Sequence, residues 1–263
     1  MKIAALIATR PRMHSLLATS LPSIARQVRA PDIVVVVPDS RPLSCTEQLQ
    51  CEMALNSIPL KVLSHVGKAG VAAAWNRGLD ELARLGGTDH VALIDDDDEW
   101  DNDHLFTCET AARKMTPSAQ VVISGLRIVR DGREIPREPL TALRAEDFLA
   151  GNPGWQGSNT FIALDLLRSI GGFTTGLRSA NDRDLAIRVL DQPGVRIAYT
   201  HRMTATWHLG SQADSISRYG SEDKRHGLSQ FHRMYSHRMT PQIRQQAVRR
   251  AVELFGIDPE SSP

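Results

Sequence analysis

The chain has 263 residues, of which 41% are hydrophobic and 23% charged, and this composition excludes a disordered, collagen-like or disulfide-scaffold protein. Lys and Arg number 31 against 30 Asp and Glu, so the net charge of +1 provides no bulk attraction to nucleic acid or to an anionic membrane. No apolar run approaches the roughly 20 residues of a membrane helix, and we expect no integral membrane segment. Three cysteines without CxxC spacing, and no leader-like N-terminus, predict a cytoplasmic protein with reduced thiols.

The first half alternates short apolar runs with longer amphipathic segments, a pattern typical of parallel strands covered by helices on both faces. Strands are predicted at 2–8, 33–37, 60–64 and 91–94, and helices at 13–28, 46–56 and 71–85. We therefore expect an α/β fold with a mostly parallel, doubly wound central sheet. In such a sheet the ligand site lies beyond the carboxyl ends of the strands.

The second half is less regular beyond about residue 115. A strand is predicted at 121–130, and Asp131-Gly132 indicates a hairpin turn. An ordered loop at 151–157, a strand at 160–163 and a helix at 182–190 follow. From residue 222 onward the chain is predicted to be helical, with one apolar face formed by Ile243, Ala247, Val248, Ala251, Val252 and Phe255. We expect one domain at 1–210 and a C-terminal helical extension at 211–263.

An acidic cluster follows the predicted strand at 91–94. Seven of the nine residues from Asp95 to Asp103 are carboxylates. Such crowding raises carboxyl pKa values and destabilises the fold unless something neutralises the charge. Hard oxygen ligands at the end of a buried strand suit Mg²⁺ or Mn²⁺, which bind one or two carboxylates together with substrate phosphates. A solvated acidic turn is the alternative, but the strand before the cluster and Trp100 within it favour an anchored metal–phosphate site.

Several common nucleotide and hydrolase motifs are absent from the sequence. There is no G-x-G-x-x-G after the first strand and no G-x-x-x-x-G-K-[ST], so neither a Rossmann dinucleotide site nor a P-loop is predicted. H-E-x-x-H, G-x-S-x-G and paired CxxC motifs are also missing. What remains is a sheet on which an acidic, metal-dependent turn holds a diphosphate.

Three ordered blocks carry a family resemblance: residues 70–78 (GVAAAWNRG), residues 93–100 (LIDDDDEW), and residues 171–173 (GGF) followed by 181–188 (NDRDLAIR). They resemble the Gly-Val-Ala-x-Ala-x-Asn-x-Gly, D-x-D and Gly-Gly-Phe with Glu-Asp-x-Asp-Leu-x-x-Arg blocks of glycosyltransferase family 2. The resemblance spans roughly residues 3 to 210. It implies a GT-A fold and an inverting nucleotide-sugar enzyme, with a nucleotide-sugar half at about 1–115 and an acceptor half at about 116–210.

The resemblance also implies site residues. Asp95 and Asp97 would be the D-x-D pair, with Asp97 the direct ligand of Mn²⁺ or Mg²⁺, and Asp182 would be the catalytic base. We expect the nucleotide sugar, a UDP-sugar, to contact Thr9, Arg10, Asp39, Lys68, Gly70, Asn76, Asp95 and Asp96.

Further candidates have two interpretations each. His208 is either a third metal ligand or a half-buried side chain beside a tryptophan. Trp155 is either a platform for the acceptor sugar, with Asn181 nearby, or a core anchor of a Gly-rich loop. Asp182 itself could be only a favourable first-turn residue of a helix capped by Ser179 or Asn181. Asp184 is expected to pair with Arg188 four residues later.

Transfer by single displacement needs a stabilised diphosphate, one general base and attack from the opposite face. A glycosidase needs two carboxylates flanking the bond and has no use for a metal turn. Two alternatives stay open: a nucleotidyltransferase on a similar fold, and a catalytically silent sugar- or partner-binding module. The acceptor classes left open are a saccharide, a lipid-linked glycan, a protein and a modified nucleic acid base. The C-terminal helices would serve as an acceptor lid or as the surface of a homodimer.

Overall fold

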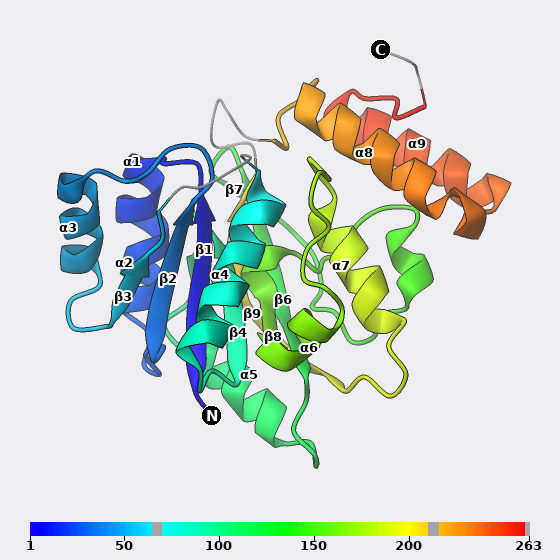
Figure 1. The fold of residues 1–263 in the computed structure, drawn as a ribbon. Coiled ribbons are helices and arrows are strands. Elements are labelled where there is room, and N and C mark those ends of the chain that lie inside the picture. The colour runs from blue at the N-terminus through cyan, green and yellow to red at the C-terminus, as the bar shows by residue number, and fades with distance from the viewer. Residues whose placement is uncertain (65–69, 210–215, 261–263) are drawn as a thin grey trace.

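One continuous sheet organises the molecule (Figure 1). The computed structural model describes residues 1–64, 70–209 and 216–260. Within these residues nine strands form a sheet of order β3-β2-β1-β4-β8-β6-β9-β5, with β7 paired to β6. Apolar side chains fill a separate core on each side of this sheet.

The first half of the sheet is parallel, as predicted. Its strands are β3 (Leu60–Val62), β2 (Ile33–Pro38), β1 (Ile3–Thr9) and β4 (His90–Asp95). All seven residues of β1 are buried, because helices cover both faces. The covering elements are α1 (Met13–Ser15), a π-helical turn (Leu16–Ser20), α2 (Leu21–Ala25), α3 (Cys45–Ala54) and α4 (Val71–Leu85).

The second half of the sheet mixes strand directions. β8 (Thr160–Ala163) runs antiparallel to both β4 and β6 (Val121–Arg130), and β7 (Arg133–Ile135) returns from β6 in the predicted hairpin. β9 (Ile197–His208) is parallel to β6 and antiparallel to the short β5 (Glu99–Trp100). The sequence did not predict β5, β9, α5 (His104–Arg113) or α6 (Leu164–Ser169). β9 has a half-exposed, largely polar first half, so it lacks the continuous apolar run of the other strands.

The C-terminal helices α8 (Glu222–Tyr235) and α9 (Pro241–Phe255) lie on the same side of the molecule as α7 (Asn181–Leu190) (Figure 1). Side chains of α7, α8 and α9 share one apolar core. On α9 only part of the predicted apolar face is buried: Ala247 and Ala251 are, whereas Val252 is 45% exposed. No helix in the described ranges has both the length and the apolarity to cross a bilayer.

Two of the sequence blocks meet at one contact. The Asn76 amide on α4 donates to the Phe173 carbonyl at 2.8 Å, and its Oδ1 accepts from the Phe173 backbone N–H at 2.7 Å. Trp75 stacks on the Phe173 ring with centroids 5.8 Å apart. Gly172 has a φ of 66°, and a Cβ there would collide with Asn76 Oδ1. The Asn and the paired glycines therefore hold α4 against the loop that leads to α7.

Candidate active site

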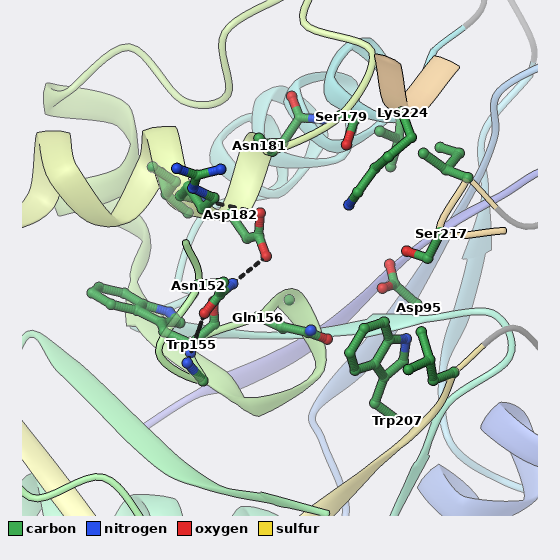
Figure 2. A pocket seen from close by; sticks show the side chains of 18 of the residues that line it. Asp95, Asn152, Trp155, Gln156, Ser179, Asn181, Asp182, Trp207, Ser217 and Lys224 are labelled. Atoms are coloured by element: carbon green, nitrogen blue, oxygen red, sulfur yellow. Dashed lines mark hydrogen bonds between the residues drawn. The ribbon is translucent and has the colours of Figure 1, made fainter. Parts of the chain in front are cut away.

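A cavity of about 500 Å³ lies beyond the carboxyl ends of β1, β2 and β4, and both halves of the chain line it. The parallel half contributes Arg10, Asp39, Asp95, Asp96 and Asp97, and the opposite wall carries Asn152, Gln156, Asn181 and Asp182. Lys224 of α8 and Arg250 of α9 also line it. Figure 2 shows Asp95 and Asp182 on opposite sides of this space.

The acidic turn is anchored at its far end by Asp98. This side chain is fully buried, and its carboxylate accepts from the Ser158 hydroxyl at 2.5 Å and from the His208 backbone N–H at 3.2 Å. The Trp100 indole donates to the Ser158 carbonyl at 2.6 Å. Burial raises the pKa of Asp98 well above its usual value, and Asp95 and Asp97 add to the rise. The turn is therefore a fixed part of the sheet edge rather than a solvated loop.

The other carboxylates of the turn differ in how they are compensated. Asp96 is 1% exposed and accepts from the Thr9 hydroxyl and from the Arg12 guanidinium, both at 2.5 Å. Asp97 lies 3.0 Å from another nitrogen of Arg12. The structure gives the Asp95 carboxylate no hydrogen-bond donor within the described part of the chain. Burial raises the pKa values of Asp95 and Asp96 to about 7, and the neighbouring carboxylates contribute in both cases.

This donor set fits a divalent cation bound together with phosphates. Asp95 and Asp97 line the cavity, and repulsion among the crowded carboxylates would be relieved by a cation. Across the described residues, no group of three or more His, Cys, Asp or Glu side chains converges on one metal position. Mg²⁺ and Mn²⁺ sites that use one or two carboxylates and complete their shell with phosphate and water need no such group.

His208 does not join these carboxylates. Its Nε2 lies 3.4 Å from Glu99 Oε1, and Trp207 and Leu209, on either side of it, line the cavity while His208 does not. Side chains alternate between the two faces of a strand, so His208 at the end of β9 points away from the cavity. The interpretation of His208 as a metal ligand is therefore corrected.

The predicted nucleotide residues fall into two groups. Arg10 and Asp39 line the cavity, with Arg10 Nε 3.7 Å from Asp39 Oδ2, and Arg10 also lies 3.5 Å from Asp223 of α8. Thr9, Gly70 and Asn76 are not part of the lining: Thr9 holds Asp96, Gly70 precedes α4, and Asn76 holds Phe173. These three support the site from behind rather than face it. Lys68 lies outside the described residues.

Asp182 occupies the first turn of α7 and faces the cavity. The residue before the helix, Ala180, has a φ of 64°, and no side chain caps the helix, so neither Ser179 nor Asn181 has the capping role. Asp182 Oδ2 accepts from the Asn152 amide at 2.5 Å, and Oδ1 accepts from the Arg183 backbone N–H at 2.9 Å. The Asn181 Oδ1 atom is buried and has no hydrogen-bond partner in the described part of the structure.

Asp184 has the structural role expected of it. Its carboxylate lies 2.8 Å from Arg188 of the same helix and accepts from the hydroxyls of Thr174 and Tyr235, both at 2.8 Å. Asp184 is 1% exposed and lies outside the cavity lining. Asp182 and Asp184 therefore lie on different sides of α7: Asp182 faces the cavity, and Asp184 is buried in the core.

Trp155 is a core residue, which corrects its interpretation as an acceptor platform. It is 1% exposed, its indole N–H donates to the Thr160 hydroxyl at 2.7 Å, and its ring meets the Phe148 ring edge-on at 6.0 Å. Trp155 is also among the residues that line the cavity.

Sequence reasoning missed Asn152, Gln156 and Lys224, which all line the cavity (Figure 2). Lys224 reaches from α8 into the space between Asp182 and Asp95, with its Nζ 4.3 Å from the Phe255 ring centre. Burial lowers the pKa of Lys224 to about 8, while Asp182 opposes that shift. No local pattern marks these residues, because only the tertiary packing of α8 and of the loop at 151–157 brings them to the site.

No protein-family profile and no curated protein matches the sequence. Solved structures do match the fold. Residues 1–349 of Staphylococcus aureus TarS, in complex with UDP-GlcNAc, superpose with a TM-score of 0.67 at 18% identity, covering 96% of this chain and 73% of that chain. The mannosyltransferase PcManGT from Pyrobaculum calidifontis, in complex with GDP-Man and Mn²⁺, superposes with a TM-score of 0.59 at 18% identity, covering 96% and 69%. The chain therefore has the GT-A-type fold of these glycosyltransferases, as the sequence predicted.

Proposed function

We propose that the chain is a metal-dependent inverting glycosyltransferase that moves a sugar from a nucleoside-diphosphate sugar to an acceptor hydroxyl. One observation carries this proposal: a single cavity has the acidic turn Asp95–Asp97 on one wall and the Asp182 carboxylate on the other. The fold supports it, because structures of the same fold hold UDP-GlcNAc and GDP-Man. We place nucleotide binding in residues 1–115 and acceptor binding in residues 116–210, with the described part of the C-terminal extension, residues 216–260, closing the cavity.

At the donor end, Asp39 and Arg10 would contact the nucleoside, and Asp95 and Asp97 would hold Mn²⁺ or Mg²⁺ against the diphosphate. The bound ion would act as a Lewis acid on the phosphate oxygens. Lys224 adds a second cation to the same space, from the opposite side. Asp96 is already bonded to Thr9 and Arg12, so we assign it the support of the turn rather than a direct contact.

At the acceptor end, Asp182 would act as the general base. The acceptor oxygen attacks the anomeric carbon, its proton passes to the Asp182 carboxylate, and the bond from that carbon to the diphosphate oxygen breaks with its electron pair. One base and no acid partner fit a single displacement with inversion. Asn152 fixes the carboxylate for this step through its bond to Oδ2. Asn181 also lines this end of the cavity, where we expect its side chain to contact the acceptor.

The first test is thermal unfolding against UDP, GDP, dTDP and CMP, each with and without Mn²⁺ or Mg²⁺. A ligand at 100 times its dissociation constant adds about 2.7 kcal/mol to the stability. We expect a shift with one diphosphate, and only when the metal is present. No shift with any nucleotide would favour the catalytically silent module.

The product that is released distinguishes a glycosyltransferase from a nucleotidyltransferase, the remaining alternative. With UDP-GlcNAc or GDP-Man as the donor, we expect a nucleoside diphosphate to be released. A nucleotidyltransferase working on the same fold would instead exchange pyrophosphate with a nucleoside triphosphate.

A further inference from the structure

The wall of the cavity around Asp182 carries guanidinium groups that no carboxylate compensates. Arg137, which follows β7, and Arg250 of α9 both line the cavity. Neither has a carboxylate within ion-pair distance anywhere in residues 1–64, 70–209 and 216–260. Most other arginines of the cavity are paired: Arg10 with Asp39, Arg12 with Asp96, and Arg178 with Asp223.

Both arginines are held by the backbone of one loop. Arg137 donates to the Pro153 carbonyl at 2.7 Å, and Arg250 donates to the Asn152 carbonyl at 2.8 Å. Each guanidinium lies against a glycine of that loop: a Cβ on Gly154 would collide with Arg137, and a Cβ on Gly151 with Arg250. The loop at 151–154 is therefore held by two arginines from distant parts of the chain.

The two cations act on each other and on a third. Burial lowers the pKa of Arg137, and the positive charge of Arg250 adds to this effect. Burial also lowers the pKa of Arg183 to about 10; Asp182 opposes this shift, and the charge of Arg250 adds to it. Arg183 is fully used inside the protein, since it donates to the carbonyls of Phe148 and Leu149. Repulsion among three guanidiniums is a cost to the folded state that a bound anion would remove.

Most N–H groups of Arg137 and Arg250 make no hydrogen bond to the described part of the protein. A guanidinium has five N–H groups in a planar fork that matches the oxygens of a carboxylate or phosphate. Among the described residues, Arg137 and Arg250 each make one hydrogen bond, to a loop carbonyl. The same loop carries Asn152, whose amide holds Asp182. An anion bound here would lie beside the proposed base, at the opposite end of the cavity from the acidic turn.

We propose that Arg137 and Arg250 form an oxyanion site for the acceptor, so that the acceptor is a sugar or glycan that carries a phosphate or carboxylate group. The assignment of the anion to the acceptor rests on the proposed function, because the donor diphosphate is assigned to the metal end. The anion would hold the loop at 151–154 in place and thereby keep Asn152 and Asp182 aligned with the acceptor hydroxyl.

The test is calorimetric titration of glucose 6-phosphate, glucuronate and glucose into protein saturated with UDP and Mn²⁺, so that the donor end is occupied. We expect at least one of the two anionic sugars to bind, neutral glucose not to bind, and affinity to fall with ionic strength. The stronger of the two anions identifies phosphate or carboxylate as the group recognised. Arg137→Gln and Arg250→Gln should each weaken binding about tenfold, since each removes charge-assisted hydrogen bonds.

Matched controls are available next to each arginine. Arg133→Gln and Arg249→Gln change exposed residues outside the cavity lining and should leave binding unchanged. Arg250→Lys keeps the charge without the fork and should retain the salt dependence with intermediate affinity. Unfolding temperatures of all variants check that the loop still folds.

Three results would overturn the proposal: no binding of either anionic sugar, equal binding of glucose, or unchanged binding in both Gln variants. A loss of UDP affinity in these variants would also overturn it, because the arginines would then belong to the donor site. Failure of the proposed function is a different result. In that case the wild type binds none of the four nucleotides, and the titration repeated without nucleotide still reports on the arginines.

Discussion

The two ends of the cavity have opposite charges and opposite means of support. At the acidic end, Asp95, Asp96 and Asp97 crowd together with Arg12 as a shared cation. At the basic end, Arg137 and Arg250 have only backbone carbonyls as hydrogen-bond partners within the ranges that the structure describes. A carbonyl group orients a guanidinium without neutralising its charge. The positive charge of Arg137 and Arg250 is therefore available to an anionic ligand. At the acidic end, Arg12 neutralises part of the negative charge, and we expect the remaining carboxylates to bind protons or a metal ion.

The strongest test of this division is Asp182→Asn, which removes the proposed base and keeps its shape. Because a positioned general base contributes about 10²- to 10⁴-fold, we expect the transfer rate to fall by that factor. Nucleotide binding at the acidic end should be unchanged. Release of nucleoside diphosphate measures the rate, and Asp165→Asn, an exposed aspartate on α6, is the control. Unchanged transfer by Asp182→Asn would remove the base from the mechanism.

The second test acts only on the acidic end. Asp97→Asn should abolish the metal-dependent part of nucleotide stabilisation, a loss of about 2.7 kcal/mol when the ligand is at 100 times its dissociation constant. Melting curves with nucleotide, with and without Mn²⁺, measure it. Asp131→Asn is the control, since this turn residue lies far along the chain at a φ of 51°, a conformation that Asn also accepts. An intact metal-dependent shift in Asp97→Asn would place the metal elsewhere.

The third test weakens the link between the loop at 151–154 and the base. Asn152→Ala removes the amide that donates to Asp182, together with the side-chain hydrogen bonds to the backbone of Gly154 and Trp155. We expect transfer to slow by at least about tenfold, because the hydrogen bond to the charged group and the bonds that hold the loop are lost together. Nucleotide affinity should not change. Asn102→Ala, an exposed residue near α5, provides the comparison. If nucleotide affinity fell instead, the loop would belong to the donor end.

The last test is a pH dependence of stability without ligand. The folded-state pKa of Asp95 is raised to about 7 from 3.8, so the folded protein holds a proton there that the unfolded chain releases. This contribution to stability is present below pH 3.8 and is lost as the pH rises through about 7. Asp95→Asn lacks the ionisation, so its advantage over the wild type should grow from pH 5 to pH 8, by about 2 to 3 kcal/mol, because about two pH units of proton linkage lie in that range.

Urea unfolding of both proteins at pH 5, 6, 7 and 8, without nucleotide and without metal, measures this difference. Buried titrating groups that do not interact with Asp95, such as His104, whose pKa burial lowers to about 3, act on both proteins and cancel. A difference that stays constant with pH would show that Asp95 is not protonated in the folded state.

The sequence predicted the acidic end far better than the basic end. The parallel strands are buried on both faces, so they read as continuous apolar runs, and the carboxylates follow β4 directly in the chain. The basic end is formed by the loop at 151–154, by the segment after the β6–β7 hairpin and by helix α9. Arg137 and Arg250 have no local pattern that separates them from exposed arginines, and Asn152 stands in an ordinary turn sequence.

For two residues the sequence left two interpretations open, and the packing distinguishes them. Because β9 was not predicted, the alternation that turns His208 away from the cavity could not be applied. Trp155 was either an acceptor platform or a core anchor, and its 1% exposure favours the core anchor. Asp182 was identified through the resemblance alone, and its position on the cavity wall is consistent with that assignment.

The Asn76–Phe173 contact also bears on how the protein folds. Its two hydrogen bonds join residues 97 positions apart, and closing so long a segment costs chain entropy before any contact compensates for it. Strands β1 and β2 and helix α4 are closer in sequence and can pair earlier. We therefore expect the wall that carries Asp182 to dock late, so that a nascent chain has paired parallel strands before it has a cavity.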